Sequence, residues 1–485
     1  MLSKSKVIRG LQCPKSLWLY THKYNLQDQI DASQQAIFDT GQDVGVLAQE
    51  IWSGGIDATE GHDYPNILCA KETQRLIADG QHIIYEATFV YDDTLVAVDI
   101  LAYENGVWNA YEVKSSTSVK DVYYDDAATQ YYVMKGAGID IQNSSIVHIN
   151  TDYVRDGEFA AYDFFTIENI TNAVLGLQDD MPATINRLHE LIKGDMPELE
   201  IGGHCSNPYG CSFMGHCWQH VPDYSIFNIA RIGAKAWDLY EQNILELKDI
   251  PDDFPLSANQ RLQLVADKTD KEIIDKEGLA HFVAELNYPI YYLDYETINP
   301  AVPMFDGQKP YRQMPFQYSL HVQKKEGGTI THYEYLAPTN GQDPREEFIK
   351  KLIKDCGKKG DILVYNIGFE RSKTQDLIDA FPAYESQLEK IIWRMKDLMI
   401  PFQQKMYYTP AMQGRYSIKN VLPALVPELS YNELEIADGG TASAIYASHF
   451  VNKKPVPIEI KQQLLDYCKM DTWAMVKLLE KLIAV

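Results

Sequence analysis

Two carboxylates and a lysine lie in neighbouring apolar segments in the first quarter of the chain. Asp99 and Glu112 each fall in a β-type run, and Lys114 follows Glu112 by two positions. Carboxylates on adjacent strand ends can hold a hard divalent cation through oxygen. Because strand side chains alternate, Lys114 shares a face with Glu112 and can orient water or neutralise phosphate charge. This pattern predicts metal-dependent phosphodiester cleavage, with Glu86 in the preceding strand as a second-rank acidic residue.

A second set of carboxylates follows much later in the chain. Asp294 and Glu296 are two apart at the end of a buried-type strand, so both project from one face. Glu370 lies where another strand runs into a helix. On the closing helix, Tyr467 and Asp471 are four residues apart and stack on one side. Asp294 and Glu296 can therefore share a metal ion.

Cysteines supply a third constellation. Cys205, Cys211 and Cys217 are separated by five-residue gaps in a Gly/Pro-containing loop, and Cys13 is a plausible fourth ligand. Four thiolates suit a [4Fe–4S] cluster or a tetrahedral zinc ion. Paired Cys knuckles with two to four intervening residues are typical of zinc, and these wider gaps favour the cluster. The remaining cysteines are expected to be buried packing residues: Cys69, Cys356 and Cys468.

The bulk composition is that of a globular protein. A chain of 485 residues is too long for one ordinary core, so two domains are expected. The odd number of cysteines argues against a secreted disulfide framework, and the basic start lacks the apolar block of a signal peptide. Cytoplasmic location without membrane contact is the expectation. The net charge of −24 requires any nucleic-acid groove to be locally basic.

Hydrophobic periodicity predicts two α/β cores. The first half has a mostly helical segment over 7–52, then period-two strands separated by turn residues, a helix and a returning strand. The second half has a comparable order, ending in a helix. The expected elements are strands at 83–90, 95–102, 107–113 and 145–149, a helix at 122–135, strands at 288–297, 316–322, 329–336 and 361–366, and a helix at 344–356.

The first half resembles the PD-(D/E)XK nucleases, in particular the RecB-like branch with an iron–sulfur cluster, which includes CRISPR-associated exonucleases. Asp99, Glu112-Val113-Lys114 and Gln130 on the following helix carry the resemblance. It implies a restriction-endonuclease-like core over 1–220, catalytic roles for the Asp, Glu and Lys, and cluster ligation by the four cysteines.

Two positions depart from that family. The family's Gln-x-x-x-Tyr is incomplete because position 134 is Met. Many members also place a metal-binding histidine in an early helix, and segment 33–52 contains none. The residues that could substitute for it are Gln42, Gln49 and Glu50.

The second half resembles the DnaQ-like DEDD exonucleases of the tyrosine subclass, which have an RNase H-like core. The resemblance covers 285–485, after a helical connector at 221–284, and looks like an uncharacterised bacterial branch. Its carriers are Asp294-x-Glu296, Glu370 after a strand, and Tyr467-x-x-x-Asp471. Glu370 departs from the Asp that the family normally has there. The resemblance implies that the four carboxylates hold two Mg²⁺ or Mn²⁺ ions and that Tyr467 positions the attacking water. Segment 414–419 is similar to a family helix whose polar start lies near the substrate.

These resemblances imply a bifunctional nuclease that cleaves DNA, with single-stranded ends and 3′→5′ polarity in the C-terminal half. RNA remains an alternative substrate, because DEDD domains digest both. A second hypothesis keeps only the DEDD centre and makes the first half a docking module. A third is a non-catalytic protein that binds nucleic acid or assembles a complex. The sequence leaves the oligomeric state open.

Overall fold

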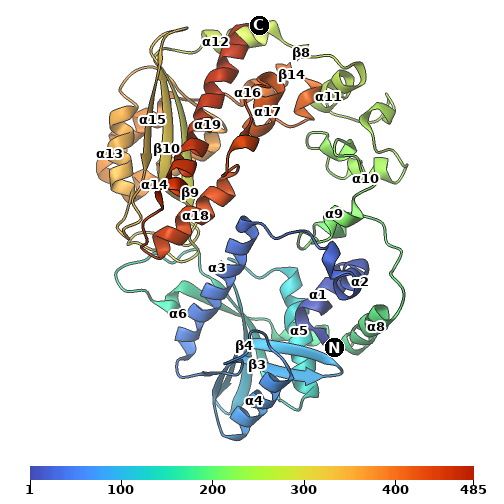
Figure 1. Cartoon of the computed structure of the whole chain (residues 1–485). Helices are drawn as coiled ribbons and strands as arrows, with labels where there is room; N and C mark the ends of the chain where they lie inside the picture. The colour runs from blue at the N-terminus through green and yellow to red at the C-terminus, as the bar shows by residue number, and fades with distance from the viewer. The chain divides into compact units, whose positions relative to one another are not determined.

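The protein has two compact units, each built from helices and a sheet. The computed structural model describes residues 1–485, the side chain of Asn432 excepted. Unit 1 comprises Met1–His220 and Ala301–Tyr311; unit 2 comprises Val221–Pro300 and Arg312–Val485. The α/β class and the two-domain organisation expected from the sequence are therefore confirmed (Figure 1). Residues 221–284, which the sequence suggests as a connector, belong to unit 2.

The sheet of unit 1 has the order β2-β3-β4-β5-β6-β7, and β1 pairs in parallel with β4. Tight antiparallel turns join β3 to β4 and β4 to β5. Their central residues, Asp92-Asp93 and Asn105-Gly106, all have positive φ, as two-residue hairpin turns require. The strands are β1 (Leu2–Ser3), β2 (Ile56–Asp57), β3 (Ile83–Tyr91), β4 (Thr94–Glu104), β5 (Val107–Lys114), β6 (Ile141–Ile149) and β7 (Phe165–Asn169).

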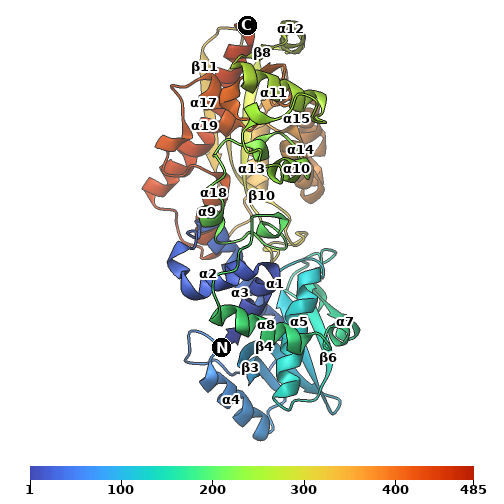
Figure 2. The same cartoon turned by 90° about the vertical axis from the view of Figure 1, so that its right-hand side faces the viewer.

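Helices cover both faces of this sheet. A large apolar core lies between the sheet and α1, α4 and α5, while α3 packs on a second core formed with β4 and β5. Figure 2 shows α5 beside β6. The helices are α1 (Lys4–Gln12), α2 (Pro14–His22), α3 (Ala32–Ala48), α4 (Ile67–Ala78), α5 (Asp121–Gly136), α6 (Ala161–Phe164), α7 (Thr171–Gly176), α8 (Met181–Lys193) and α9 (Met214–Cys217).

A segment distant in sequence completes unit 1. Residues 301–311 connect two strands of unit 2, yet Ala301 is buried in the core that contains α3. The Tyr311 hydroxyl donates to the Ser115 carbonyl, and the Arg155 guanidinium donates to the Pro303 carbonyl at 2.9 Å. Gly307 N–H donates to the Arg155 carbonyl at 2.8 Å. Nothing in the local sequence pattern predicts this placement.

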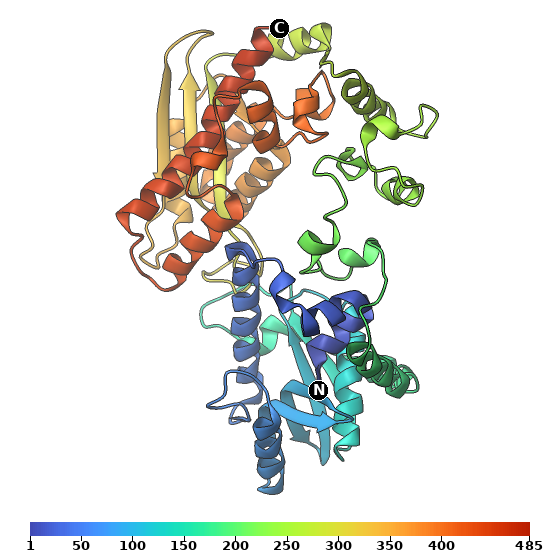
Figure 3. The same cartoon turned by 45° about the vertical axis from the view of Figure 1, so that its right-hand side comes forward.

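The sheet of unit 2 has the order β11-β10-β9-β12-β13, with β9, β12 and β13 mutually parallel. Apolar residues of α13, α14 and α15 pack on one face, and α18 and α19 lie against the other (Figure 3). The two faces of β9 therefore differ, with Leu293 in the apolar core and Asp294 on the α19 side. The strands are β9 (Ile290–Ile298), β10 (Met314–Gln323), β11 (Ile330–Leu336), β12 (Ile362–Val364) and β13 (Met395–Asp397).

A smaller apolar core and a two-stranded sheet of β8 (Ile273–Ile274) and β14 (Tyr407–Tyr408) complete unit 2. Of the helices in the described part of the chain, none is long and apolar enough to cross a membrane. The helices of unit 2 are α10 (Lys235–Tyr240), α11 (Ala258–Thr269), α12 (Lys276–Ala284), α13 (Arg345–Asp355), α14 (Ile367–Ala380), α15 (Glu385–Arg394), α16 (Ile400–Gln403), α17 (Ile418–Leu425), α18 (Gly439–Val451) and α19 (Ile458–Ile483).

One buried arginine holds the turn that leads into β12. The Arg394 guanidinium donates to the carbonyls of Cys356, Gly357, Lys359 and Gly360 at 2.6–3.1 Å. Arg394 is only 7% exposed, so water cannot replace these bonds. Because β12 runs directly into α14, this anchor fixes where the first turn of α14 begins.

Replacing this anchor should destabilise unit 2 strongly. We expect Arg394→Met to lower the free energy of unfolding by at least about 3 kcal/mol, because buried carbonyls lose charge-assisted partners. Arg394→Lys should restore only part of the loss, since an ammonium cannot span four carbonyls. Urea denaturation measures both. Arg75→Met is the control, because Arg75 pairs with Glu72 and Asp79 on the surface of unit 1 and should matter little. Equal losses in the Arg394 and Arg75 variants would refute the anchor role.

Candidate active site

Four acidic residues converge on the α19 face of the unit 2 sheet. Asp294 and Glu296 come from the central strand β9, where Asp294 is half-buried and Glu296 is 8% exposed. Glu370 lies in the first turn of α14, and Asp471 lies on α19. The charge of Asp471 raises the pKa of the other three, and that of Asp294 raises the pKa of Glu296 and Glu370, so the four form one electrostatic unit. We call this set the unit 2 centre: Asp294, Glu296, Glu370 and Asp471.

The position of Glu370 follows from how α14 begins. The Asp397 carboxylate, at the end of β13, accepts from the backbone N–H groups of Asn366 and Ile367, both at 3.1 Å. Asn366 has φ +83°, a left-handed conformation that Asn tolerates better than most residues. These contacts start the helix directly after β12 and turn Glu370 towards the carboxylates on β9.

A buried polar network fixes α19 on the sheet. The Thr472 hydroxyl bonds to Ser319 at 2.7 Å and to His321 Nδ1 at 2.8 Å, both from β10. About two helical turns earlier on α19, the Leu464 carbonyl accepts a hydrogen bond from Gln317 at 2.7 Å. Since Thr472 follows Asp471 directly, these bonds set the depth at which Asp471 enters the centre.

The negative charge of the unit 2 centre is poorly compensated. Burial, reinforced by neighbouring carboxylates, raises the pKa of Asp294, Glu296 and Glu370 well above the ordinary range. Burial also raises the pKa of Asp471 to about 6, although it accepts a 2.7 Å hydrogen bond from the Tyr431 hydroxyl. Glu370 Oε2 is buried and has no hydrogen-bond partner among the described residues. An orphaned oxygen within a set of hard oxygen donors is what a divalent cation would satisfy.

Two polar residues that the sequence did not single out complete the surroundings. The Lys419 ammonium lies 5.1 Å from the Tyr467 ring centroid and 5.6 Å from that of Tyr431, and it donates to the Ala437 carbonyl. The positive charge of Lys419 lowers the pKa of the nearby carboxylates. The only sequence signal for Lys419 was the polar helix start at 414–419; Tyr431 had none.

Tyr467 reaches the same region. A Cβ atom on Gly439, at the start of α18, would lie 3.4 Å from Glu296 Oε2 and 3.6 Å from the Tyr467 hydroxyl. Glycine therefore allows the start of α18 to approach both groups closely. Burial, followed by the charges of Asp471 and Glu296, raises the pKa of Tyr467, so its hydroxyl keeps its proton. All five residues predicted for this centre are brought together.

In unit 1, two acidic residues lie where adjacent strands lose their regular alternation. Glu86 on β3 has φ +50°. The strand pairing skips Glu86 and Asp99, because the residues before and after Glu86 pair with those after and before Asp99 on β4. Val98 and Leu101 are three residues apart, so regular alternation would place them on opposite faces of the sheet. Both lie in the same core, which shows that the alternation is interrupted near Asp99. Irregular strands of this kind re-aim side chains, often at functional sites. Burial and the charge of Glu112 raise the pKa of Glu86 to about 7.

We call Asp99, Glu112 and Lys114 the unit 1 centre. Lys114 and a further lysine, Lys4, both contact Glu112. Lys4 Nζ and Lys114 Nζ both donate to Glu112 Oε1, at 2.5 and 2.7 Å. Gln130 donates to Glu112 Oε2 at 2.6 Å, so both oxygens of Glu112 are engaged. Although burial opposes it, the two lysines hold the pKa of Glu112 below its ordinary value.

Two further carboxylates in this region also have partners. Asp99 Oδ2 accepts from the Val113 N–H at 2.6 Å, and Asp126 accepts from Lys114 at 2.5 Å. The contact with Lys4 was not anticipated, because a residue near the start of the chain gave no signal for this site. Both oxygens of Glu112 already accept hydrogen bonds in this arrangement, and the two lysines neutralise its charge, which disfavours a cation there.

A cavity of about 710 Å³ lies beside the unit 1 centre. Asp99, Glu112 and Lys114 line it together with Gln42 and Gln49 of the α3 region. Glu50, the other proposed histidine substitute, is not among the lining residues. His62, which lies outside the early helix and was not singled out from the sequence, also lines the cavity.

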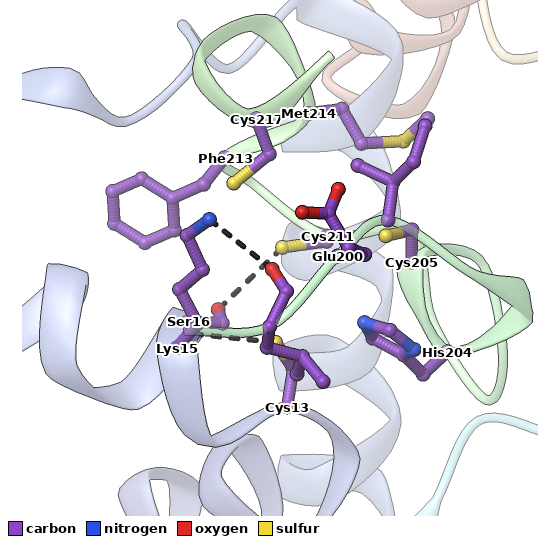
Figure 4. Close-up of a pocket in the computed structure, with 12 residues that line it drawn as sticks. Cys13, Lys15, Ser16, Glu200, His204, Cys205, Cys211, Phe213, Met214 and Cys217 are labelled. Carbon is purple, nitrogen blue, oxygen red and sulfur yellow. Dashed lines mark hydrogen bonds between the residues drawn. The ribbon is translucent and has the colours of Figure 1, made fainter. Parts of the chain in front are cut away.

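The four cysteines expected to share a ligand gather in unit 1. Cys13 lies at the start of α2, and Cys205, Cys211 and Cys217 come from the loop after α8; all four line one small cavity (Figure 4). Figure 4 shows their sulfur atoms around a common space. Other contacts tie the same segments together, since Gln12 donates to the carbonyls of His204 and Tyr209 at 2.8 and 2.6 Å.

The thiol spacing is wider than a single zinc ion needs. Zn–S bonds of about 2.3 Å in a tetrahedron put sulfur atoms about 3.8 Å apart. Within the described chain, no three of these four sulfur atoms lie within 4.8 Å of one another. Burial raises the pKa of Cys13 and of Cys217, so without a ligand both thiols stay protonated at neutral pH. The donor set and its spacing fit a larger, thiolate-bound group.

The fold and its centres define a two-unit α/β protein with a buried carboxylate centre in one unit and a cysteine cluster in the other. The family described as "Domain of unknown function (DUF2779)" matches residues 291–417. The matched region begins within β9 and ends before α18, so it contains Asp294, Glu296 and Glu370.

The chain is also similar to uncharacterized proteins from mollicutes. It is 28% identical over 217 residues to "Uncharacterized protein UU173" of Ureaplasma parvum serovar 3, a match covering 40% of this chain and 31% of the relative. It is 26% identical over 208 residues to "Uncharacterized protein MG366 homolog" of Mycoplasma pneumoniae, covering 38% of this chain and 31% of the relative. The chain thus spans about a third of the length of these curated relatives.

The charge of the unit 2 centre predicts a specific response to cations. We expect Mn²⁺ to stabilise the protein by about 2–3 kcal/mol at a hundredfold excess over its dissociation constant. Asp294→Asn should abolish this gain, and without metal it should be more stable than the wild type at pH 8, because a buried like charge is removed. Thermal unfolding with and without Mn²⁺ measures both effects.

Two controls accompany this measurement. Asp379→Asn removes an exposed carboxylate of α14 and should leave the Mn²⁺ effect intact.

The second control is the pH dependence of stability without metal. Because the pKa of Asp471 is raised on folding, its protonated form stabilises the folded protein below the unfolded pKa, and this stability is lost as pH rises through about 6, the folded pKa of Asp471. Mn²⁺ should therefore stabilise least below pH 6, where the ligands hold protons. Equal Mn²⁺ shifts in wild type and Asp294→Asn would contradict the assignment.

Proposed function

We propose that this protein is a metal-dependent nuclease whose reactive centre is the unit 2 centre, acting as a 3′→5′ exonuclease on DNA. The observation that carries the proposal is the buried, uncompensated carboxylate set, with Glu370 Oε2 left without a partner. These residues occur along the chain in the same order as in tyrosine-type DEDD exonucleases. That resemblance supports cleavage in the 3′→5′ direction. Divalent cations bound there would activate water and stabilise the departing oxygen.

The chain's own residues have separate roles in this proposal. Asp294, Glu296 and Asp471 hold the cations, with Glu370 completing the set. The protonated Tyr467 hydroxyl orients the attacking water near Glu296. Lys419 supplies positive charge on the same side and would neutralise a substrate phosphate.

Cleavage of end-labelled nucleic acid tests the proposal. With Mg²⁺ or Mn²⁺, the full chain should shorten single-stranded DNA from its 3′ end. Asp294→Asn should reduce the rate at least about a hundredfold, since lost outer-shell partners alone cost up to that much. Parallel reactions with 5′- and 3′-labelled DNA and RNA give polarity and substrate class. Absence of cleavage of either polymer by metal-loaded, cluster-loaded protein would leave a non-catalytic binding protein as the surviving hypothesis.

A second candidate function adds cleavage by unit 1, which would make the protein a bifunctional nuclease. The cavity of about 710 Å³ beside Asp99 supports this version. The engagement of Glu112 by Lys4 and Lys114 weighs against it, because a reacting carboxylate would have to exchange both partners. Asp99→Asn, included in the same assay, separates the versions: a single-centre enzyme keeps its activity.

We infer that Cys13, Cys205, Cys211 and Cys217 hold a [4Fe–4S] cluster, with zinc as the alternative. The wide thiol spacing supports the cluster. Its role would be structural, joining the first helices to the end of unit 1 and closing a chain loop whose closure is entropically unfavourable.

Metal content distinguishes the two ligands. Anaerobically purified protein should contain about four iron atoms per chain and absorb visible light. Cys205→Ser should lose most of the iron and lower the melting temperature of unit 1. Cys69→Ser, at a buried cysteine outside the cluster, should retain the iron. Stoichiometric zinc without iron would refute the cluster.

A further inference from the structure

A cysteine thiol lies among the carboxylates of the unit 2 centre. Cys468 follows Tyr467 on α19, and its side chain is fully buried. Its sulfur atom lies 3.7 Å from Asp294 Oδ2 and 3.9 Å from the Asp294 carbonyl oxygen. The sequence suggested only a packing residue at this position, because no second cysteine lies near it in the chain.

The spacing of these atoms matches that of ligands around one ion. The Cys468 sulfur and one carboxylate oxygen each from Asp294 and Glu296 all lie within 4.8 Å of one another. Around a tetrahedral ion with a metal–sulfur bond of about 2.3 Å and a metal–oxygen bond of about 2.0 Å, the sulfur and oxygen are separated by about 3.5 Å. The observed 3.7 Å is close to this value.

Burial alone does not explain the placement. Cys356, the other buried cysteine of unit 2, packs in the apolar core on the opposite face of the sheet, among residues such as Leu352 and Ile391. An apolar pocket is the usual environment of a structural thiol. Cys468 instead faces the carboxylates of Asp294 and Glu296.

We propose that Cys468 is a direct ligand of the cation held by Asp294 and Glu296, which gives the centre a mixed oxygen–sulfur donor set. This inference rests on the proposed function. On binding, the thiol releases its proton to solvent as the sulfur–metal bond forms, and no electron is transferred. A thiolate favours softer divalent ions, so the centre prefers Mn²⁺, Co²⁺ or Zn²⁺ over Mg²⁺.

Co²⁺ absorption reports sulfur ligation without relying on activity. Titration of cluster-loaded protein with Co²⁺ should produce thiolate-to-cobalt charge-transfer absorption in the wild type that is absent in Cys468→Ser. Since both proteins carry the other cysteines, subtracting their spectra removes any other thiol contribution. We expect Cys468→Ser to weaken Co²⁺ binding at least about tenfold while Mg²⁺ binding changes little. Cys356→Ala, the matched control, should retain the band and the affinity.

The outcomes separate this inference from the proposed function. Serine keeps a hydroxyl that can donate to Asp294, so a thiol acting only as a hydrogen-bond donor would leave the cation preference of Cys468→Ser unchanged. If Co²⁺ stabilises the wild type, Asp294→Asn abolishes that gain and no sulfur band appears, the inference is overturned and the carboxylate centre stands. If Co²⁺, Mn²⁺ and Mg²⁺ all fail to stabilise the wild type, the proposed function fails with it.

Discussion

Repulsion among buried carboxylates is the constraint on which the architecture of unit 2 depends. Asp294, Glu296, Glu370 and Asp471 are held together by rigid elements, although burial raises the pKa of each and neighbouring carboxylates raise the pKa of the first three further. The fold supplies the restraint. Asp397 fixes the start of α14, and the Thr472 network fixes α19. A site that is this unfavourable without cations is one that cations would stabilise strongly.

Unit 1 meets the same electrostatic problem with a different solution. Its acidic residues are also buried, yet Lys4 and Lys114 neutralise Glu112 directly, and Gln130 uses its second oxygen. Internal cations thus take the place that an external cation would fill in unit 2. Two carboxylate motifs that look alike in the sequence therefore have different charge compensation in the structure. Through its contact with Glu112, Lys4 at the start of α1 becomes part of the surroundings of the unit 1 centre.

The sequence predicted the parts of the fold that depend on local periodicity and turn chemistry. The strands around Asp99 and Glu112 follow from alternation between the Asp92-Asp93 and Asn105-Gly106 turns. Strand and helix periods place Asp294 with Glu296, and Tyr467 with Asp471, on common faces, whereas Glu370 is predicted from its position where a strand runs into a helix. Long-range contacts left no local signal: Lys4 on Glu112, Tyr431 on Asp471, and residues 301–311 within unit 1. The predicted burial of Cys468 is confirmed, but its contact with Asp294 was not predicted, because the two residues are 174 positions apart.

The most direct test of the account is the location of bound Mn²⁺ in crystals of the full chain, found by anomalous scattering. The account predicts Mn²⁺ within bonding distance of the Asp294 and Glu296 carboxylates, and none at Glu112 while Lys4 and Lys114 contact it. Mn²⁺ bound at Asp99 and Glu112, with none in unit 2, would contradict it.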